Sequence, residues 1–389
     1  MIEIKKVDLV EEFENGRFLI APGHYDYYGG AERQSILLAK ALIENYRCHV
    51  DFLGWGGDGI LADKVRELGI KPWVFPLPDP QNRMKMAASL FSLARFIKNE
   101  IKPDYLLPFV SYHSKVIGSI WRYTGARFTW WNQRDEGRLV YGTRTERKLM
   151  RTLPSIVSNS FEGRDFLINK FDLPFERVRV INNGVILPKD EVDNAWREKL
   201  GLAPDDILIT MVASLTQYKD HDTLLRAFAI ARKSTNGSKF RLVLAGRFGD
   251  TTKHLKALAF DLGLGDSVAM VGEIHDVDSL LSASDLMVHS SIMEGCPNSV
   301  LEAMAQRKCV IGSNISGMRQ VLGYSAESYL AKPGDVDHLA GLIVQLANAP
   351  EQRVQAGINN RNRIESEFSI SHMTTQVLET VLENRVNLG

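Results

Sequence analysis

Two glutamates eight residues apart are the side chains of this sequence with the clearest chemical meaning. Glu294 and Glu302 lie in SSIMEGCPNSVLEAMAQ (290–306), where an apolar strand is expected to end and a helix to begin near Asn298. Each carboxylate oxygen accepts hydrogen bonds, so such a pair suits recognition of a ribose by one glutamate and of a sugar by the other. The competing interpretation is a surface loop glutamate plus a glutamate that the helix dipole favours.

The elements around this loop alternate between short apolar strands and amphipathic helices. A strand at 17–23 leads through HYDYYGG into the helix AERQSILLAKALIENY, and the same alternation continues to SIVSNS (155–160). It restarts with the strand at 207–215, and the strand CVIGSN (309–314) completes the second series. This pattern predicts an α/β fold of two doubly wound, Rossmann-like domains with parallel sheets, whose ligands bind at the carboxyl ends of the strands.

The boundary between the two domains is expected near Asn183-Gly184, a turn-forming pair followed by Pro188. We therefore predict an N-terminal domain over 1–186 and a C-terminal domain over 187–371. The last helix, at about 372–389, lies beyond the final strand and is expected to pack on the first domain.

The composition narrows the classes of protein that the chain can belong to. A length of 389 residues suits two domains, and a formal net charge of zero argues against a general nucleic-acid binder. Neither a run of about 18 apolar residues nor an apolar leader is present, so we expect neither a membrane span nor a signal peptide. The cysteines Cys48, Cys296 and Cys309 show no disulfide or zinc spacing. These features together predict a cytoplasmic protein.

The segment EGCPNSVLEAMA closely resembles the E-x7-E signature of family 4 of the retaining glycosyltransferases, which have the GT-B fold. Other segments occur in matching order: GGAERQSILLAKAL, SNSFEGRDFL, VINNGV, ASLTQYKDHDTLLRAF and VGEIHDVDSLLSASDLMVHSSIMEG. The resemblance covers roughly 17–375. It implies two Rossmann-like domains facing across a cleft, with the acceptor bound by the first domain and a nucleotide diphosphate sugar by the second.

The resemblance also implies roles for single residues. Glu302 would bond the ribose hydroxyls, and Glu294 the hydroxyls of the transferred sugar. Lys219 would neutralise charge on the leaving diphosphate. The backbone near Ile274 would meet the base, and two sets of backbone groups would approach the sugar and the phosphates: Gly295, Cys296, Pro297, Asn298 and Ser299 in one, Gly29 and Gly30 in the other.

The chain departs from the family pattern in two places. Ser214 stands where the family usually has an arginine, five residues before the lysine. The family often has a histidine after this strand of the N-terminal domain, whereas the segment RFTWWNQRDEG offers Asn132, Gln133, Arg134 and Asp135. Arg134 is a candidate replacement cation and His113 a further candidate for ligand contact, although a lone histidine is more often structural.

Other motifs have simpler explanations. Asp276-Val-Asp278 and Asp335-Val-Asp337 are DxD triplets, which hold a metal in other transferases, but each precedes an apolar helical run and is better explained by N-capping. The basic segment around Arg138, Arg144, Arg147, Lys148 and Arg151 fits either a peripheral contact with anionic lipid or a solvated face.

Together these features predict a metal-independent, retaining glycosyltransferase without a cofactor. The expected donor is a nucleotide diphosphate sugar, with UDP favoured over GDP, and the expected acceptor is a saccharide or lipid-linked saccharide of cell-envelope synthesis. Two alternatives stay open: a nucleotide-sugar epimerase on the same fold, and a non-catalytic sugar-nucleotide binding protein.

Overall fold

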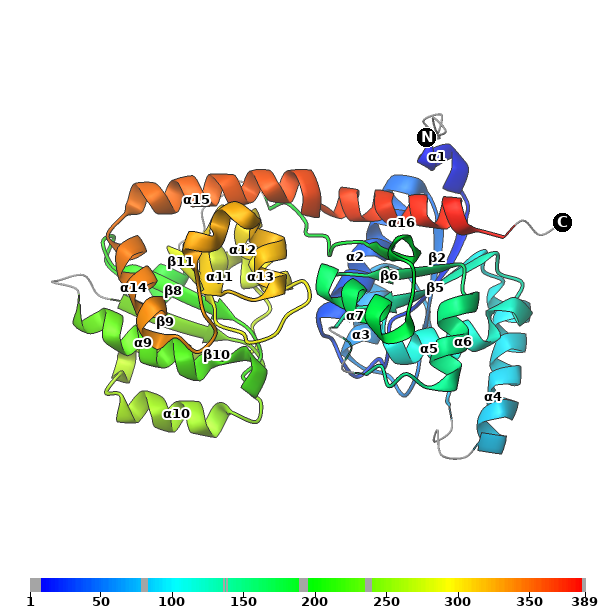
Figure 1. Cartoon of the computed structure of the whole chain (residues 1–389), viewed down its shortest axis with the longest axis horizontal. Helices are drawn as coiled ribbons and strands as arrows, with labels where there is room; N and C mark the ends of the chain where they lie inside the picture. The colour runs from blue at the N-terminus through cyan, green and yellow to red at the C-terminus, as the bar shows by residue number, and fades with distance from the viewer. Residues whose placement is uncertain are drawn as a thin grey trace. The chain divides into compact units, whose positions relative to one another are not determined.

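The computed structural model describes residues 8–77, 83–135, 137, 139–188, 195–234 and 240–386. The chain divides into two compact units. Unit 1 comprises residues up to Gly184 together with Ile370–Gly389, and unit 2 is Val185–Ser369. Figure 1 shows the course of the chain through both, and each unit is described by itself below.

Unit 1 is built on a parallel sheet with strand order β3-β2-β1-β4-β5-β6-β7. The strands are β1 (Arg17–Ala21), β2 (His49–Gly54), β3 (Pro72–Val74), β4 (Tyr105–Pro108), β5 (Phe128–Gln133), β6 (Ser155–Ser158) and β7 (Val178–Val180). Most residues of β1, β4, β5 and β6 are buried, as expected for a parallel sheet covered on both faces.

Two apolar clusters cover the two faces of this sheet. One contains residues of α1 (Leu9–Phe13), α2 (Gly30–Tyr46), α3 (Ile60–Glu67) and α16 (Ile370–Asn384). The other contains residues of α4 (Arg83–Phe96), α5 (Ser111–Ile120), α6 (Arg144–Thr152) and α7 (Phe161–Phe171). The last helix of the chain, α16, thus belongs to unit 1, where it contacts α2 and buries Met373, Val377, Leu378 and Val381.

Side chains at the helix starts explain where several of these helices begin. Ser160 caps α7 by accepting a hydrogen bond from the Gly163 amide, at 3.0 Å. Thr143 and Glu146 form a capping box at α6, in which the Thr143 amide donates to Glu146. The basic residues of α6 that the sequence singled out, Arg144, Arg147, Lys148 and Arg151, are exposed, and Arg138 lies outside the described residues.

Unit 2 has a parallel sheet with strand order β10-β9-β8-β11-β12-β13. Its strands are β8 (Ile207–Val212), β9 (Phe240–Ala245), β10 (Val268–Gly272), β11 (Leu286–His289), β12 (Cys309–Ser313) and β13 (Leu330–Ala331). The sequence placed the end of this sheet at 309–314, and that prediction was wrong by one strand. The two-residue β13, which pairs with β12, is too short to give a periodic signal.

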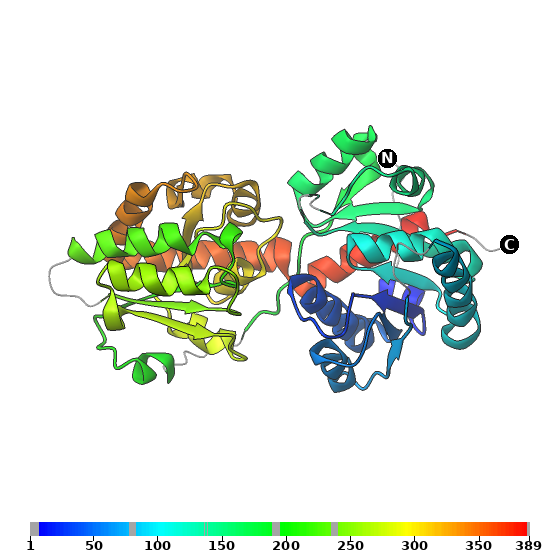
Figure 2. The ribbon, with the colours of Figure 1, turned by 90° about the horizontal axis from the view of Figure 1, so that it is seen from below.

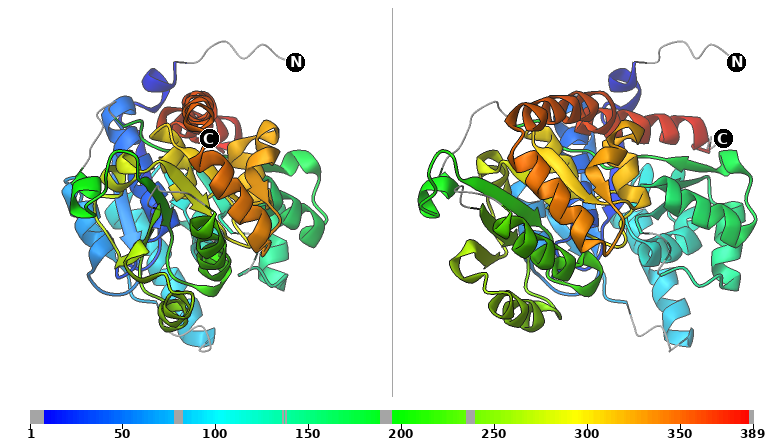
Figure 3. Two further views of the ribbon diagram at one scale, coloured as in Figure 1. Left: turned by 90° about the vertical axis from the view of Figure 1, so that its left-hand side faces the viewer. Right: turned by 60° about the vertical axis from the view of Figure 1, so that its left-hand side comes forward.

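Helices cover both faces of the second sheet as well. The helices α9 (His221–Lys233), α10 (Thr252–Asp261) and α14 (Val336–Ala347) pack on one face, and α11 (Val277–Ala283), α12 (Asn298–Ala305), α13 (Ser316–Leu322) and α15 (Pro350–Arg363) lie toward the other. Figures 2 and 3 show the sheets and helices of the units from other sides. In unit 2 the strand order reverses between β8 and β11, so the loops that follow these two strands flank the position where ligands bind in such sheets.

Candidate functional site

The loop after β11 brings backbone amides and a carboxylate to the start of a helix. Ser290 and Ser291 are fully buried, Gly295, Cys296 and Pro297 are buried, and Asn298 and Ser299 are half-buried. Helix α12 begins at Asn298 as predicted, and Pro297 at its N-cap has no side chain that could accept from the first turn. The amides at this end of α12 form the kind of terminus that attracts an anion.

Glu294 is the centre of a cluster of polar side chains. Its Oε1 accepts a hydrogen bond from Nε2 of His289 at 2.9 Å and from Oγ of Ser291 at 2.9 Å, and it forms an ion pair with Nζ of Lys219. Only 13% of the Glu294 side chain and 14% of the Lys219 side chain are exposed. The two residues that the sequence assigned to the sugar and to the diphosphate are therefore in direct contact.

The charges in this cluster are fixed by the ion pair. Burial alone would raise the pKa of Glu294, but the positive charge of Lys219 and the hydrogen bond from His289 outweigh burial and hold that pKa below its usual range. Burial lowers the pKa of His289, against the opposing effect of Glu294. At neutral pH the cluster therefore holds an ionised Glu294 beside the Lys219 cation.

Two loops that are far apart in the sequence are tied together beneath this cluster. Lys219 ends a short turn, Gln217–Lys219, after β8. Ser290 Oγ donates to the carbonyl of Asp220 at 2.9 Å, and the Ile292 amide donates to the carbonyl of Tyr218 at 2.9 Å. These bonds hold Lys219 and Glu294 at one end of the β8–β11 pair.

The backbone of the loop that carries Glu294 packs closely against Gly317 of α13. A Cβ atom at Gly317 would lie 2.3 Å from the carbonyl oxygen of Glu294 and 2.7 Å from that of Gly295. We expect Gly317→Ala to displace this backbone and, through the predicted role of Glu294 in the site, to lower the turnover rate without loss of the fold. Steady-state kinetics with circular dichroism check this. Gly341→Ala, where an added Cβ meets nothing within 4 Å, is the matched control and should behave as wild type.

The remaining predicted residues of unit 2 lie around the same strand ends. Glu302 is half-buried in α12, and Ser214 is half-buried in the loop after β8. Ile274 follows β10 and packs against the cluster around Trp196. Close approach of the β8 and β9 loops requires a glycine at Gly246, where a Cβ would lie 2.1 Å from the carbonyl oxygen of Ala213.

Unit 1 positions its own group of predicted residues. Gly29 is the N-cap of α2 and Gly30 its first residue, and the Gly29 amide donates to Glu32 at 3.0 Å. Arg134 donates to Oδ1 of Asn183 at 2.5 Å and lies 5.1 Å from the ring centre of Phe109. Asn132 is buried, and its backbone N–H donates a hydrogen bond to Oγ of Ser114. These residues belong to unit 1, whereas Glu294 and Lys219 belong to unit 2.

His113 is a buried aromatic partner in unit 1. Its ring stacks on Trp55 with centroids 5.2 Å apart, and neither ring nitrogen has a hydrogen-bond partner among the described residues. Burial, helped by the nearby His24, lowers the pKa of His113 to about 3. The imidazole is therefore neutral at physiological pH.

This lowered pKa predicts a loss of stability in acid. A histidine in the unfolded chain titrates near pH 6.5. Below that pH the unfolded state therefore binds a proton at His113, whereas His113 in the folded state stays neutral. This difference in proton binding has no effect on stability above about pH 7, and it lowers the free energy of unfolding by about 2 kcal/mol at pH 5. Urea unfolding followed by tryptophan fluorescence reports mainly on unit 1, which holds every tryptophan except Trp196.

The variant His113→Gln should lose less stability between pH 7 and pH 5 than wild type. Replacement of the exposed His49 by Gln is the control and should leave the difference unchanged. Equal losses in wild type and His113→Gln would show that proton binding at this histidine has no such effect.

Sequence reasoning missed the residues that hold Glu294 in place. His289 and Ser291 precede it by five and three residues, and their position at the end of a buried strand was the available signal.

Arg247 is a further residue that the sequence did not single out. Its carbonyl accepts from the Leu215 amide at 3.0 Å, which places an arginine backbone beside the loop that carries Ser214.

The two DxD triplets cap helices, as predicted. Asp276 accepts from the Ser279 amide at 3.0 Å, and Asp335 accepts from the His338 amide at 3.0 Å. Among the described residues, no three His, Cys, Asp or Glu side chains are grouped so that they could hold a metal ion. Within the same residues, no helix combines the length and the apolar character needed to cross a bilayer.

Two family models match the chain and between them cover most of it. The model described as "Glycosyltransferase Family 4" matches residues 28–187, and the one described as "Glycosyl transferases group 1" matches residues 192–363. The two matched ranges meet near the boundary between unit 1 and unit 2.

Curated relatives match over part of their length. The putative glycosyltransferase EpsD of Bacillus subtilis is 33% identical over 40% of each chain. The UDP-Gal:alpha-D-GlcNAc-diphosphoundecaprenol alpha-1,3-galactosyltransferase of Escherichia coli is 25% identical over 58% of this chain and 59% of its own length. For the first three curated relatives, the match spans 40% to 48% of the relative's length.

Solved structures match over nearly the whole chain. Anabaena HepE, solved in complex with UDP, superposes with a TM-score of 0.78 and is 18% identical, covering 94% of this chain and all of its own. This likeness confirms the predicted fold class of two Rossmann-like α/β domains.

Proposed function

Because the chain belongs to family 4 of the glycosyltransferases, we propose that it transfers a sugar from a nucleotide diphosphate sugar to a saccharide acceptor, with retention of configuration. The observation that carries the proposal is the contact between Lys219 and Glu294 at the start of α12. This contact places a cation that suits a diphosphate beside a carboxylate that suits sugar hydroxyls, and both lie in the same unit as the amides at the start of α12, which suit an anion.

The proposed reaction needs no protein nucleophile. The acceptor oxygen attacks the anomeric carbon from the face that the diphosphate leaves, a bond forms between that oxygen and the carbon, and the carbon–oxygen bond to the β-phosphate breaks. The acceptor proton passes to the departing phosphate oxygen. Lys219 and the amides at α12 stabilise the charge that accumulates there, which is the form of catalysis that positioned charges provide.

In this scheme the residues of unit 2 have the roles that the family resemblance implies. Glu294 holds hydroxyls of the transferred sugar, Glu302 holds the ribose and the backbone near Ile274 meets the base. Unit 1 would bind the acceptor. From unit 1, Gly29 and Gly30 would approach the phosphates of the donor, Arg134 would be a replacement cation for the diphosphate, and His113 would be a further candidate for ligand contact. Ser214 itself supplies no cation. Arg247 joins Arg134 as a candidate for that role because the Arg247 backbone lies beside the loop that carries Ser214.

We propose UDP as the nucleotide and a lipid-linked saccharide as the acceptor. HepE was solved with UDP, and the name of the E. coli relative specifies UDP-Gal and a diphosphoundecaprenol acceptor. The exposed basic side chains of α6 suit contact with the anionic surface at which such an acceptor is presented. Salt-sensitive co-sedimentation with anionic vesicles tests this membrane contact.

One assay tests the proposed activity. The full chain is incubated with a panel of UDP-sugars, with and without an N-acetylglucosaminyl-diphospholipid, and UDP release and glycosylated lipid are measured. We expect acceptor-dependent release of UDP that excess chelator leaves intact. Isomerisation of the sugar without acceptor would indicate an epimerase instead. Binding of a UDP-sugar without turnover would indicate a non-catalytic protein. Loss of UDP release in chelator, restored by Mg²⁺ or Mn²⁺, would indicate a metal-dependent transferase.

A further inference from the structure

A polar cavity lies in unit 2, beside the turn that carries Lys219. It has a volume of about 300 Å³ and lies between the first turns of α9 and α10. Its walls include Gln217, Asp220, His221, Asp250 and Thr251, with Leu255 as an apolar contact. This volume is at the lower end of the range for small-molecule sites and suits one small ligand.

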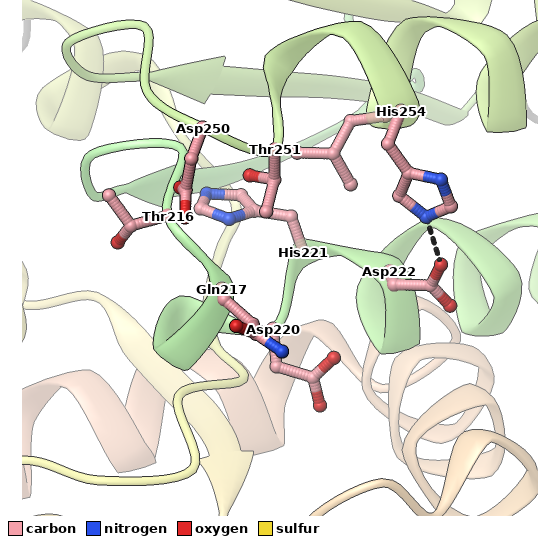
Figure 4. A pocket seen from close by; sticks show the side chains of 9 residues that line it. Thr216, Gln217, Asp220, His221, Asp222, Asp250, Thr251 and His254 are labelled. Atoms are coloured by element: carbon pink, nitrogen blue, oxygen red, sulfur yellow. Dashed lines mark hydrogen bonds and ion pairs between the residues drawn. The ribbon is translucent and has the colours of Figure 1, made fainter.

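His221 is a buried polar side chain aimed into this cavity. It is 1% exposed, and neither of its ring nitrogens has a hydrogen-bond partner among the described residues. Figure 4 shows its ring directed toward the side of the cavity formed by Thr216, Asp250 and Thr251. Buried polar atoms are nearly always hydrogen-bonded, so an orphaned imidazole in a cavity wall indicates a ligand that would complete it.

The imidazole of His221 offers one donor and one acceptor. Burial, with the charges of His289 and Lys219, lowers the pKa of His221 to about 4, so the ring is neutral at pH 7. A neutral ring carries one N–H and one bare nitrogen, which match the two roles of an alcohol hydroxyl.

The other polar groups of the wall separate into those with protein partners and those that a ligand can use. Asp220 caps α9 by accepting from Thr223. Asp222 accepts from Arg226 and from His254, and the latter bond is drawn in Figure 4. Asp250 and Gln217 are exposed, and their side chains make no hydrogen bond to another described residue, which leaves a carboxylate and an amide beside the neutral imidazole.

We propose that this cavity binds one sugar residue of a glycan, at a site separate from that of the nucleotide sugar. A carboxylate, an amide, a neutral imidazole and an apolar contact are together the groups that bind hydroxyls and the apolar face of a sugar ring. The carboxylates of the wall disfavour an anionic ligand. Because Gln217 and Lys219 share one short turn, a bound sugar would also steady the turn that presents Lys219.

This proposal rests on the chemistry of the cavity wall and not on the transferase activity. The test uses the full chain saturated with UDP, whose binding is measured in the same samples. Methyl α-glucoside, methyl α-galactoside, N-acetylglucosamine and maltose are titrated, and contact is detected by saturation-transfer NMR and by the ring-nitrogen shifts of His221. At least one sugar should bind in the millimolar range and shift the His221 resonances.

Variants of exposed wall residues locate the site without disturbing the core. Asp250→Ala and Gln217→Ala should each weaken sugar binding by about tenfold while UDP binding is unchanged. Asp261→Ala, at the far end of α10, is the matched control and should bind as wild type.

Three results would overturn the proposal. One is the absence of binding by every sugar tested. Another is sugar binding that Glu294→Ala abolishes and Asp250→Ala leaves intact, which would place the sugar in the donor site. The third is Asp250-dependent binding of spermidine or Mn²⁺ without binding of sugars, which would identify a cation site. Failure of UDP to bind would instead count against the proposed function.

Discussion

Replacing Lys219 by alanine is expected to lower kcat by about 10²–10³-fold, the usual cost of removing one group that stabilises developing negative charge. Lys219 is the cation that the structure places against Glu294. Ser214 stands at the position where the resemblance implies an arginine, so the loss of Lys219 should leave the diphosphate without either of the two cations that the resemblance implies. The effect should fall on kcat more than on KM, because the leaving-group charge is largest in the transition state.

The same substitution should also destabilise unit 2. It removes one partner of a nearly buried ion pair, for which the cost is about 3–5 kcal/mol when nothing replaces the partner. His289 and Ser291 still hydrogen-bond Glu294, so we expect a loss below that range. Kinetics are therefore measured well below the melting temperature of the variant. Lys219→Arg, which keeps the charge, should recover much of the stability, and Lys256→Ala on α10 controls for loss of a lysine.

Comparison with Arg134→Ala and the double variant decides which unit supplies the cation. Arg134 bonds Asn183 within unit 1. If Lys219→Ala turns over near the wild-type rate and Arg134→Ala does not, the diphosphate is held from unit 1 and the role assigned to Lys219 is wrong.

Glu294→Ala is expected to lower kcat/KM by about 10–10²-fold. This is the range for removing hydrogen bonds to a charged group, each of which contributes about 1.5–3 kcal/mol. Glu294 would hold the sugar hydroxyls, and its loss also frees Lys219 and His289 from the geometry that they share. The variant should keep its affinity for UDP, which lacks the sugar, and lose discrimination between UDP-sugars.

The variant Glu294→Gln distinguishes the effect of losing the negative charge from the effect of losing the side-chain volume. It keeps one oxygen acceptor and the side-chain volume, so it should retain more activity than Glu294→Ala while still losing the ion pair to Lys219. Equal activity of wild type and both variants, measured with saturating acceptor, would remove Glu294 from the sugar site.

The fold was largely readable from the sequence because parallel strands and their helices have strong periodic signals. The strand that precedes Glu294, the start of α12 at Asn298 and the capping roles of Asp276 and Asp335 were all predicted correctly. The prediction failed at β13, whose two residues are paired with β12 by tertiary contacts alone.

The site was readable only in part, because its contacts join residues distant in the chain. The sequence indicated Glu294 and Lys219 separately, but their ion pair depends on the adjacency of β8 and β11, which periodicity does not specify. The support from His289 and Ser291 depends on side-chain direction at the end of β11. The joint contribution of the two units to one site stays a prediction.

The central claim is that unit 2 holds a uridine nucleotide through the loop and helix that carry Glu294 and Glu302. Calorimetric titration of UDP into the full chain, into Glu302→Ala and into the exposed control Glu351→Ala tests it directly. We expect UDP to bind the wild-type and control proteins alike. Glu302→Ala should bind it about 10–10²-fold more weakly, as for the loss of one charged hydrogen-bond acceptor. Undetectable binding of UDP to the wild type, or equal affinity in all three proteins, would contradict the account.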